Sequence, residues 1–407
     1  DHTSLNWQNT TTLATTRFFD GDSVIFDNSA VVPLTVNVTE IINPGQVGTG
    51  ILVSNTTGTF TFAAAGGSIG NCALVKTAAG PIQIDCPTTA AVAVNQGTLT
   101  GSGSIGGTTI ASGASLNFGG AINGALQVAG TATLASSGTI NNTFTVQSTG
   151  VFTNNGTVQG GSMTLNDGAT LFNSAAGTLL NIGNAGSVNV ASNATLINVG
   201  NIGAALQANS LTVGGTFKDL GLGTIYLTTL TVNSGGTFLP GGDGIGISAI
   251  LSPGVGSTFP GRVTLLTGST TLIKVDFSNP QTNTIVKSQF QDFGANVNTK
   301  SFDGCTILVT NINTGAGQFA LGQSFRMFQN SDVNITSGNI GNEGLNTTNR
   351  YPIIQPIIPV ANTRWDLANL RDTDPNGFVN IIGFPTTGTN ITYATFVADG
   401  TNLVSHL

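Results

Sequence analysis

The 407-residue chain is almost free of charge: charged residues make up 7% of it, and the formal net charge is −7. Globular domains usually carry about 25% charged residues, so surfaces here must be covered mainly by neutral polar side chains. Nucleic acid is excluded as a natural partner, because phosphate binding needs clustered lysine and arginine. A hydrophobic content of 39% argues equally against a disordered chain.

The composition predicts an all-β protein. Glycine, at 56 residues, supplies together with Asn and Asp the positive φ angles of tight turns, while Thr, Val and Ile favour strands. Glutamate occurs only at Glu40 and Glu343, so strong helix formers are scarce. No apolar run reaches the ~18 residues of a membrane-spanning helix. The sequence begins at Asp1 rather than Met, and we expect a processed, mature protein.

Residues 1–95 hold longer strand-like segments and more charge than the part that follows. We interpret them as a cap followed by the first rungs of a repeat array. Cys72 and Cys86 lie in two neighbouring strand-like segments, and in an oxidising compartment they would form a disulfide. The alternative is that both are small buried apolar residues.

Residues 96–250 contain an internal repeat of about 18 residues. One series of apolar residues comprises Ile110, Val128, Val146 and Leu165, and a second comprises Ile105, Ile122, Ile140 and Val158. Within each copy apolar residues alternate with polar ones, which is typical of strands. A single copy cannot bury its apolar face, but stacked copies can, at about 4.8 Å per layer. The repeat therefore predicts a right-handed parallel β-solenoid with rungs of ~18–25 residues. A β-sandwich, with hairpins in place of stacked repeats, is the alternative.

The charge pattern favours stacking of this kind. From Pro87 to Phe217 the sole ionisable side chain is Asp167. In a solenoid a repeated charge would form a ladder of like charges at strand spacing, whereas neutral Thr and Asn can hydrogen-bond along the axis. Thr-x-Thr pairs such as Thr131/Thr133 do not recur at one repeat position, so we assign them to the outward face of strands rather than to ice binding.

Residues 251–407 form a third region, β-rich but irregular, with an extended terminal strand. Cys305, in Cys305–Val309, is assigned to its core. The segment containing Asp372, Asp374 and Asn376 starts like a calcium loop, in which alternating oxygens bind a hard cation. Gly383 stands where such a loop needs Glu, and an ordinary turn is the alternative. We expect no other cofactor than a calcium ion at this segment.

Three groups of motifs resemble the autotransporter-associated β-strand repeat proteins. The first is Trp7 with Phe19–Asp27; the second comprises Ile42–Gly45, Phe60–Phe62, Gly67–Ile69 and Leu74–Lys76; the third is Leu251–Gly254 with Leu272–Phe277. The resemblance implies a secreted β-solenoid passenger at the cell surface, with a role in adhesion, aggregation or surface-layer building. The family often carries a membrane β-barrel as well, and the sequence leaves open whether one was removed or never present.

Catalytic machinery is not evident in the sequence, and we predict that the chain is not an enzyme. The two histidines, His2 and His406, sit at the ends of the sequence and are poor candidates for the oriented base that a Ser-His-Asp or Cys-His arrangement needs. The remote alternative is a polysaccharide-degrading β-helix enzyme. Such an enzyme needs paired carboxylates on neighbouring rungs, and the repeat offers Asp167 alone.

The expected function follows from the predicted architecture. Each end of a solenoid exposes strand edges with unpaired backbone groups, and a contact that does not close produces a filament. We therefore expect an extracellular subunit that associates end to end with copies of itself into a surface fibre or sheath. A monomeric adhesin, which would bind a cell-surface or matrix polysaccharide, is the alternative. The candidate assembly residues are Asn390, Ile391, Tyr393, Phe396 and Val397 near one end, and Leu5 and Trp7 near the other.

Overall fold

The structure is a computed structural model, and it describes most of the first 276 residues and shorter stretches beyond them. The described residues are 2–30, 33–45, 50–180, 186–204, 209–245, 247–251, 262–276, 285–288, 300–301, 304–312, 324–326, 328–330, 353–355, 363–366 and 378–383. Throughout this part of the chain the regular secondary structure is β, without any helix, and no helix there could cross a membrane. The chain packs as two units, Asp1–Leu179 and Leu180–Leu407.

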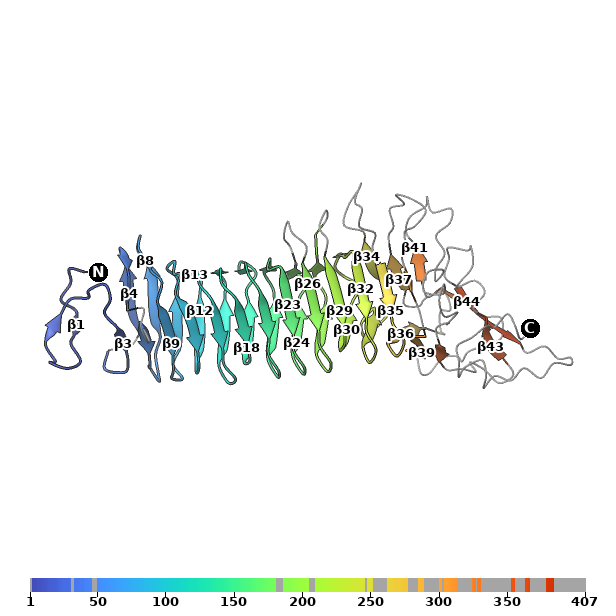
Figure 1. The fold of residues 1–407 in the computed structure, drawn as a ribbon, viewed down its shortest axis with the longest axis horizontal. Coiled ribbons are helices and arrows are strands. Elements are labelled where there is room, and N and C mark those ends of the chain that lie inside the picture. Colours follow the sequence, from blue (N-terminus) through green and yellow to red (C-terminus); the bar gives the residue numbers. More distant parts are fainter. Residues whose placement is uncertain are drawn as a thin grey trace. The chain divides into compact units, whose positions relative to one another are not determined.

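Unit 1 is built from three parallel sheets, which we call faces 1, 2 and 3, and from β11 onward each of its rungs gives one strand to each face (Figure 1). Face 1 contains β3 (Val24–Phe26), β6 (Ile51–Val53), β9 (Ala73–Lys76), β11 (Ala91–Val94), β14 (Thr108–Ile110), β17 (Leu126–Val128), β20 (Phe144–Val146) and β23 (Ser162–Leu165). Face 2 contains β4 (Leu34–Val38), β7 (Phe60–Ala64), β10 (Ile82–Ile84), β12 (Thr98–Gly101), β15 (Ser115–Phe118), β18 (Thr131–Leu134), β21 (Val151–Asn154) and β24 (Thr170–Asn173).

Face 3 of unit 1 is made of short strands. It contains β13 (Ser104–Ile105), β16 (Ala121–Ile122), β19 (Thr139–Ile140), β22 (Thr157–Val158) and β25 (Thr178–Leu179). A separate parallel pair joins β5 (Ile41–Ile42) to β8 (Ser68–Ile69), and β1 (Trp7–Gln8) forms an antiparallel pair with β2 (Thr15–Thr16).

The register of unit 1 confirms the repeat read from the sequence. Ile110 pairs with Val128, Val128 with Val146, and Val146 with Leu165. The second series pairs in the same way on face 3, from Ile105 to Val158. All these side chains are fully buried, so the two apolar series are continuous interior rows. The parallel β-solenoid is therefore the fold, and the β-sandwich is excluded for the described residues of this unit.

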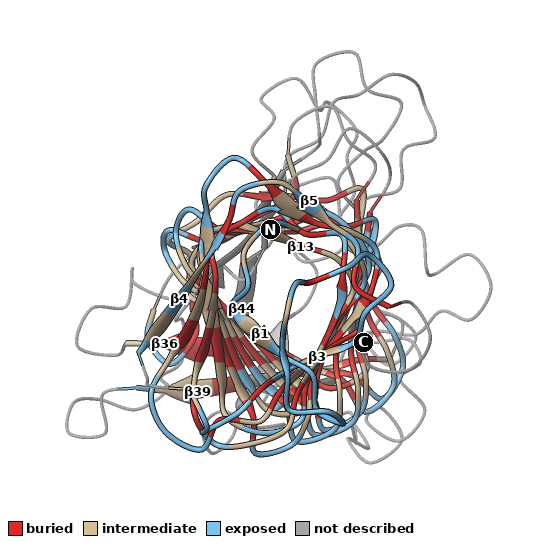
Figure 2. Ribbon diagram, turned by 90° about the vertical axis from the view of Figure 1, so that its left-hand side faces the viewer, coloured by how far each residue is buried: buried red, intermediate tan, exposed pale blue. Residues whose placement is uncertain are grey.

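Alternation along each strand separates the interior from the surface. In β18, Ala132 and Leu134 are buried, while Thr131 and Thr133 face outward. Figure 2 shows that exposed residues lie mainly at the turns and that buried residues lie mainly along the strands. Outward neighbours form polar rows; Thr133, for example, pairs with Asn117 on one side and Thr153 on the other. The polar surface predicted from composition is thus built by stacked neutral side chains.

Unit 2 repeats the same plan with longer insertions between strands. Its face 1 contains β26 (Ser187–Val190), β29 (Ser210–Val213), β32 (Thr229–Val232), β35 (Arg262–Leu265) and β38 (Lys300–Ser301). Its face 2 contains β27 (Thr195–Asn198), β30 (Thr216–Asp219), β33 (Thr237–Pro240), β36 (Thr270–Val275), β39 (Thr306–Asn311) and β42 (Ile353–Gln355). Its face 3 contains β28 (Asn201–Ile202), β31 (Ile225–Tyr226), β34 (Ile247–Leu251), β37 (Ile285–Ser288) and β41 (Phe328–Asn330). An antiparallel sheet of β40 (Ser324–Arg326), β44 (Phe378–Gly383) and β43 (Thr363–Asp366) completes it. Cys305 is buried beside β39, in agreement with its predicted core position.

Both units carry amide side chains inside the solenoid. In unit 1, the side-chain amide of Asn154 donates to Oδ1 of Asn173, 2.8 Å away on the next rung. In unit 2, Asn198 donates in the same way to Oδ1 of Asp219 at 2.9 Å. All four side chains are buried. Because a buried polar group is costly unless it is hydrogen-bonded, the bond from each amide to the amide or carboxyl of the next rung is what permits these residues inside.

Candidate assembly surface at the amino-terminal end

Unit 1 begins with unpaired strand edges. In the described part of the chain, β3 pairs only with β6, and β4 pairs only with β7. The N–H of Val24 bonds to Gly50 and that of Leu34 to Thr59. Because N–H groups alternate in direction along a strand, those of Ile25 and Thr35 point to the other, open edge. Such an edge is a template for another strand.

Aromatic rings close the interior at this end. The Trp7 ring packs edge-on against Phe26, with centroids 5.6 Å apart, and lies 6.1 Å from Phe18. Phe26 in turn contacts Phe60 and Phe62 of the next rung at 5.4 and 5.1 Å. Figure 2, which looks at this end, shows β1 lying across the opening that the rungs surround. The segment of β1 and β2 therefore acts as a plug on the core.

The packing between the plug and the first rung is incomplete. A cavity of about 30 Å³ remains between Trp7 and the first rung. Its lining includes Phe18, Val36 and Ile42. The indole N–H of Trp7 is buried there without a hydrogen-bond partner. A buried donor without a partner costs roughly 1–3 kcal/mol, so this unpaired N–H weakens the packing of Trp7 on the first rung.

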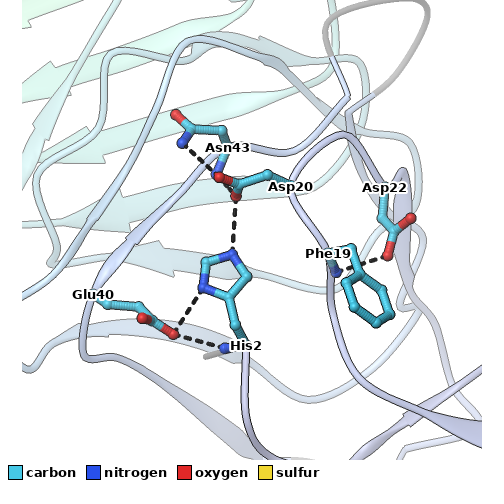
Figure 3. Close-up of polar contacts among 6 residues, drawn as sticks. All are labelled: His2, Phe19, Asp20, Asp22, Glu40 and Asn43. Carbon is cyan, nitrogen blue, oxygen red and sulfur yellow. Dashed lines mark hydrogen bonds and ion pairs between the residues drawn. The ribbon is translucent and has the colours of Figure 1, made fainter.

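A histidine fastens the plug to the first rung (Figure 3). The two ring nitrogens of His2 face two carboxylates: Nε2 lies 3.0 Å from Oδ1 of Asp20, and Nδ1 lies 3.0 Å from Oε1 of Glu40. The backbone N–H of His2 also donates to Oε1 of Glu40 at 2.6 Å. Asp20 is held by the backbone and side-chain N–H groups of Asn43, and the imidazole packs on Phe18. We call His2, Asp20 and Glu40 the histidine clamp.

The electrostatics of the clamp favour its fully charged form. Hydrogen bonds from Asn43 and then from His2 lower the pKa of Asp20 to about 2. The backbone bond from His2 lowers the pKa of Glu40. The hydrogen bond to Asp20 is the main cause that raises the pKa of His2 above 6.5. Since both ring nitrogens face acceptors, only the doubly protonated imidazolium can donate to both.

Exposed apolar side chains gather in the same region. Five of the nine exposed large hydrophobic residues of the described chain lie before residue 45. They are Leu5, Leu13, Phe19, Ile25 and Ile41, each at least 50% exposed. Of the predicted assembly residues at this end, Leu5 precedes the plug and is exposed, and Trp7 lies in the plug and is half-buried. Apolar residues beside open edges are typical of a contact surface.

The remaining predicted site residues have mixed outcomes. The calcium candidates Asp372, Asp374 and Asn376 lie outside the described residues, as do the assembly candidates Asn390, Ile391, Tyr393, Phe396 and Val397. Within the described ranges no cluster of three or more His, Cys, Asp or Glu side chains could hold a metal ion.

The disulfide predicted between Cys72 and Cys86 is not formed in the structure, where both are free thiols. Cys72 directly precedes β9 on face 1, whereas Cys86 follows β10 on face 2. The chain that links them runs along faces 1 and 2, and the short third side of the rung separates the two corners, so proximity in sequence is misleading here. Both thiols are buried, and burial raises the pKa of each to about 11. They act as small apolar residues, which was the alternative interpretation.

A buried cation in unit 1 was not predicted from the sequence. Lys76 is fully buried, in the interior row where Val53 and Val94 stand on the neighbouring rungs. Its ammonium donates to the carbonyl oxygens of Asn55 and Ala78, and burial lowers its pKa to about 8. The signal was present in the sequence, because alternation in Leu74-Val-Lys76 places Lys76 on the same side as the buried Leu74.

Comparison with known proteins does not assign the chain to a family: no family model matches it, and no curated protein matches it.

Proposed function

We propose that this chain is an extracellular structural subunit, a β-solenoid that associates end to end with copies of itself into a surface fibre or sheath, and that it is not an enzyme. The observation that carries the proposal is the amino-terminal end of unit 1. There the edges of β3 and β4 are unpaired among the described residues, next to a concentration of exposed apolar side chains.

The neutral array gives the proposal physical support. Long-range charge repulsion is weak between subunits whose repeats carry almost no charge. An incoming strand would continue the same parallel register, with side chains at inward positions completing the interior around Trp7 and Phe26. Because the two surfaces that meet are different ends of the molecule, the contact does not close on itself and generates a filament.

The location outside the cell rests on the resemblance of the Trp7, Phe19–Asp27 and Leu251–Gly254 motifs to autotransporter-associated β-strand repeat proteins. Their passengers are secreted solenoids. A β-solenoid at the cell surface would also suit a monomeric adhesin, and the oligomeric state separates the two functions.

Proline substitution at the open edge tests the proposal. Thr35 is exposed in β4, and its N–H points away from β7, so Thr35→Pro removes an edge donor without breaking the bonds to β7. Thr35→Ala retains the N–H and is the matched control. We expect the purified wild-type protein and Thr35→Ala to form filaments in negative-stain electron microscopy, and Thr35→Pro to remain monomeric with an unchanged circular dichroism spectrum.

Two results would overturn the proposal. One is a wild-type protein that stays monomeric in size-exclusion chromatography at every concentration and pH tested, which would favour the adhesin. The other is a folded Thr35→Pro variant whose filaments are as abundant as those of Thr35→Ala, which would show that the edge of β4 takes no part.

A further inference from the structure

The histidine clamp joins three segments that are distant in sequence. His2 precedes the plug, Asp20 lies in the turn before β3, and Glu40 lies between β4 and β5. The clamp therefore ties the plug to the start of one open-edge strand and to the end of the other. Whatever loosens it also loosens the cover over Trp7.

The hydrogen-bond geometry makes the clamp depend on a proton. Each ring nitrogen of His2 lies 3.0 Å from a carboxylate oxygen, and carboxylates accept hydrogen bonds but do not donate them. A neutral imidazole keeps one N–H and places the lone pair of its other nitrogen against a carboxylate oxygen. Loss of one proton thus removes one charge-assisted hydrogen bond and introduces a repulsive contact.

Among the described residues, the charged groups facing the ring are these two carboxylates, while Phe18, against which the ring packs, is neutral. The side chain of His2 is 32% exposed, so protons exchange with solvent without any opening of the core. The group can respond to external pH while the array below it stays folded.

We propose that the histidine clamp is a pH-operated latch that controls access of a second copy of this chain to the edges of β3 and β4. With the imidazolium in place the latch is closed and the plug covers the end. Loss of one proton releases the plug, uncovers Trp7 and Phe26, and permits docking. The docking half of this inference rests on the proposed function, whereas the latch itself does not.

The pH range follows from the signs of the shifts. The pKa of His2 is raised in the folded protein. The contribution of His2 to the stability of the closed clamp is therefore complete below pH 6.5, and it is lost as pH rises through the raised pKa. The pKa values of Asp20 and Glu40 are lowered, so their contributions are complete above 3.8 and 4.5 and are lost at more acidic pH. The latch is therefore tightest between pH 4.5 and 6.5 and opens on either side.

Titration of the full chain tests the latch before any assembly takes place. The chain has two histidines, so the imidazole C–H resonances in NMR are assigned with His406→Gln. The two tryptophans are separated with Trp365→Phe, which leaves Trp7 as the fluorophore. We expect His2 to titrate above pH 6.5, and the Trp7 emission to shift to the red in a one-proton step at the same midpoint.

Two variants separate a latch from a merely damaged cap. His2→Gln removes the titrating group, and its Trp7 emission should be red-shifted without a step near neutral pH. In Glu40→Gln the amide oxygen can still accept from the backbone N–H of His2 and from a protonated Nδ1, but it carries no charge. His2 should therefore titrate at lower pH than in the wild type, and the Trp7 step should move with it to the same lower midpoint. A cap that had simply been weakened would show red-shifted Trp7 emission at every pH, without a step that follows His2.

The outcomes for latch and assembly are distinguishable. A His2 midpoint at or below 6.5, or a Trp7 step that survives in His2→Gln, overturns the latch. Filaments that form at one rate from pH 5.5 to 8.5 also overturn it but leave the proposed function intact. If the Trp7 step follows His2 and no filament forms at any pH, the latch stands and the assembly role falls. Filament formation that accelerates with the opening of Trp7, and that begins at lower pH in Glu40→Gln, supports both.

Discussion

The first rungs of unit 1 and the regular rungs that follow them are built on the same register but differ in chemistry. In the interior row of face 1, the positions on β11, β14 and β17 are Val94, Ile110 and Val128, whereas β9 carries Lys76. The clamped carboxylates, the open edges and all but one of the exposed large apolar residues described in unit 1 belong to the first rungs and the plug. The regular rungs hold a single charge, Asp167, among neutral polar rows.

The difference shows what stacking demands. Where each residue has a like neighbour on the rungs above and below, a charged side chain would be repelled by the same charge on those rungs. Neutral side chains are retained there. Where the stack ends, that restriction is lifted, and charges, aromatic rings and unsatisfied groups return. Specific chemistry is therefore expected at the end of the solenoid, and uniformity along its length.

The largest expected effect comes from breaking the uniform interior. Phe152 is fully buried, and its ring lies 4.4 Å from that of Phe144. Phe152→Ala should lower the free energy of unfolding by about 3–5 kcal/mol, as measured by urea denaturation. Thr153→Ala, on the outward side of the same strand, should change it by no more than about 0.5 kcal/mol. Equal effects from the two variants would contradict the assigned alternation.

Lys76 sharpens the contrast within one interior row. Because burial lowers its pKa from 10.5 to about 8, the unfolded chain binds more protons between these values, and stability rises with pH across the window. The difference in free energy of unfolding between the wild type and Lys76→Met should therefore change by about 3 kcal/mol between pH 7.5 and 10.5. Comparing the two proteins at each pH cancels the opposite contribution of the cysteine thiols. A constant difference would show that Lys76 is solvated.

Asp219 tests whether the interior accepts only neutral polar groups. Burial raises the pKa of this carboxyl, and its Oδ2 has no hydrogen-bond partner. The unfolded chain loses its proton first, so stability falls as pH rises from 3.8 through the pKa of the folded state. Asp219→Asn should raise the free energy of unfolding by roughly 1–3 kcal/mol at alkaline pH. Denaturation midpoints measured as a function of pH should then fall less steeply than in the wild type. An unchanged decline would place its cause elsewhere.

The smallest effect concerns the outer rows. Thr133 and Thr153 are register neighbours on face 2, so Thr133→Asp with Thr153→Asp creates two like charges at strand spacing. Their coupling should cost about 0.2–1 kcal/mol in a double-mutant cycle and should shrink in 1 M salt. The pair Thr133→Lys with Thr153→Asp should reverse the sign of the coupling. Equal coupling in both pairs would show that charge does not govern these rows.

The sequence predicted the features that depend on local period. Series such as Ile110, Val128 and Val146 were identified by spacing, and they stack as expected because a two-residue alternation and an 18-residue rung leave one register. Features that depend on distant contacts were missed. Nothing near His2 in sequence reveals Asp20 and Glu40 as its partners, and the nearness of Cys72 to Cys86 in sequence hides the short face between them.

Fibre diffraction from aligned assemblies tests the central claim, that rungs continue in register from one subunit to the next, most directly. The account predicts a meridional reflection at about 4.8 Å, because the strand spacing then runs along the fibre axis. A fibre whose 4.8 Å reflection lies on the equator would mean that solenoids pack side by side, and end-to-end addition at β3 and β4 would be wrong.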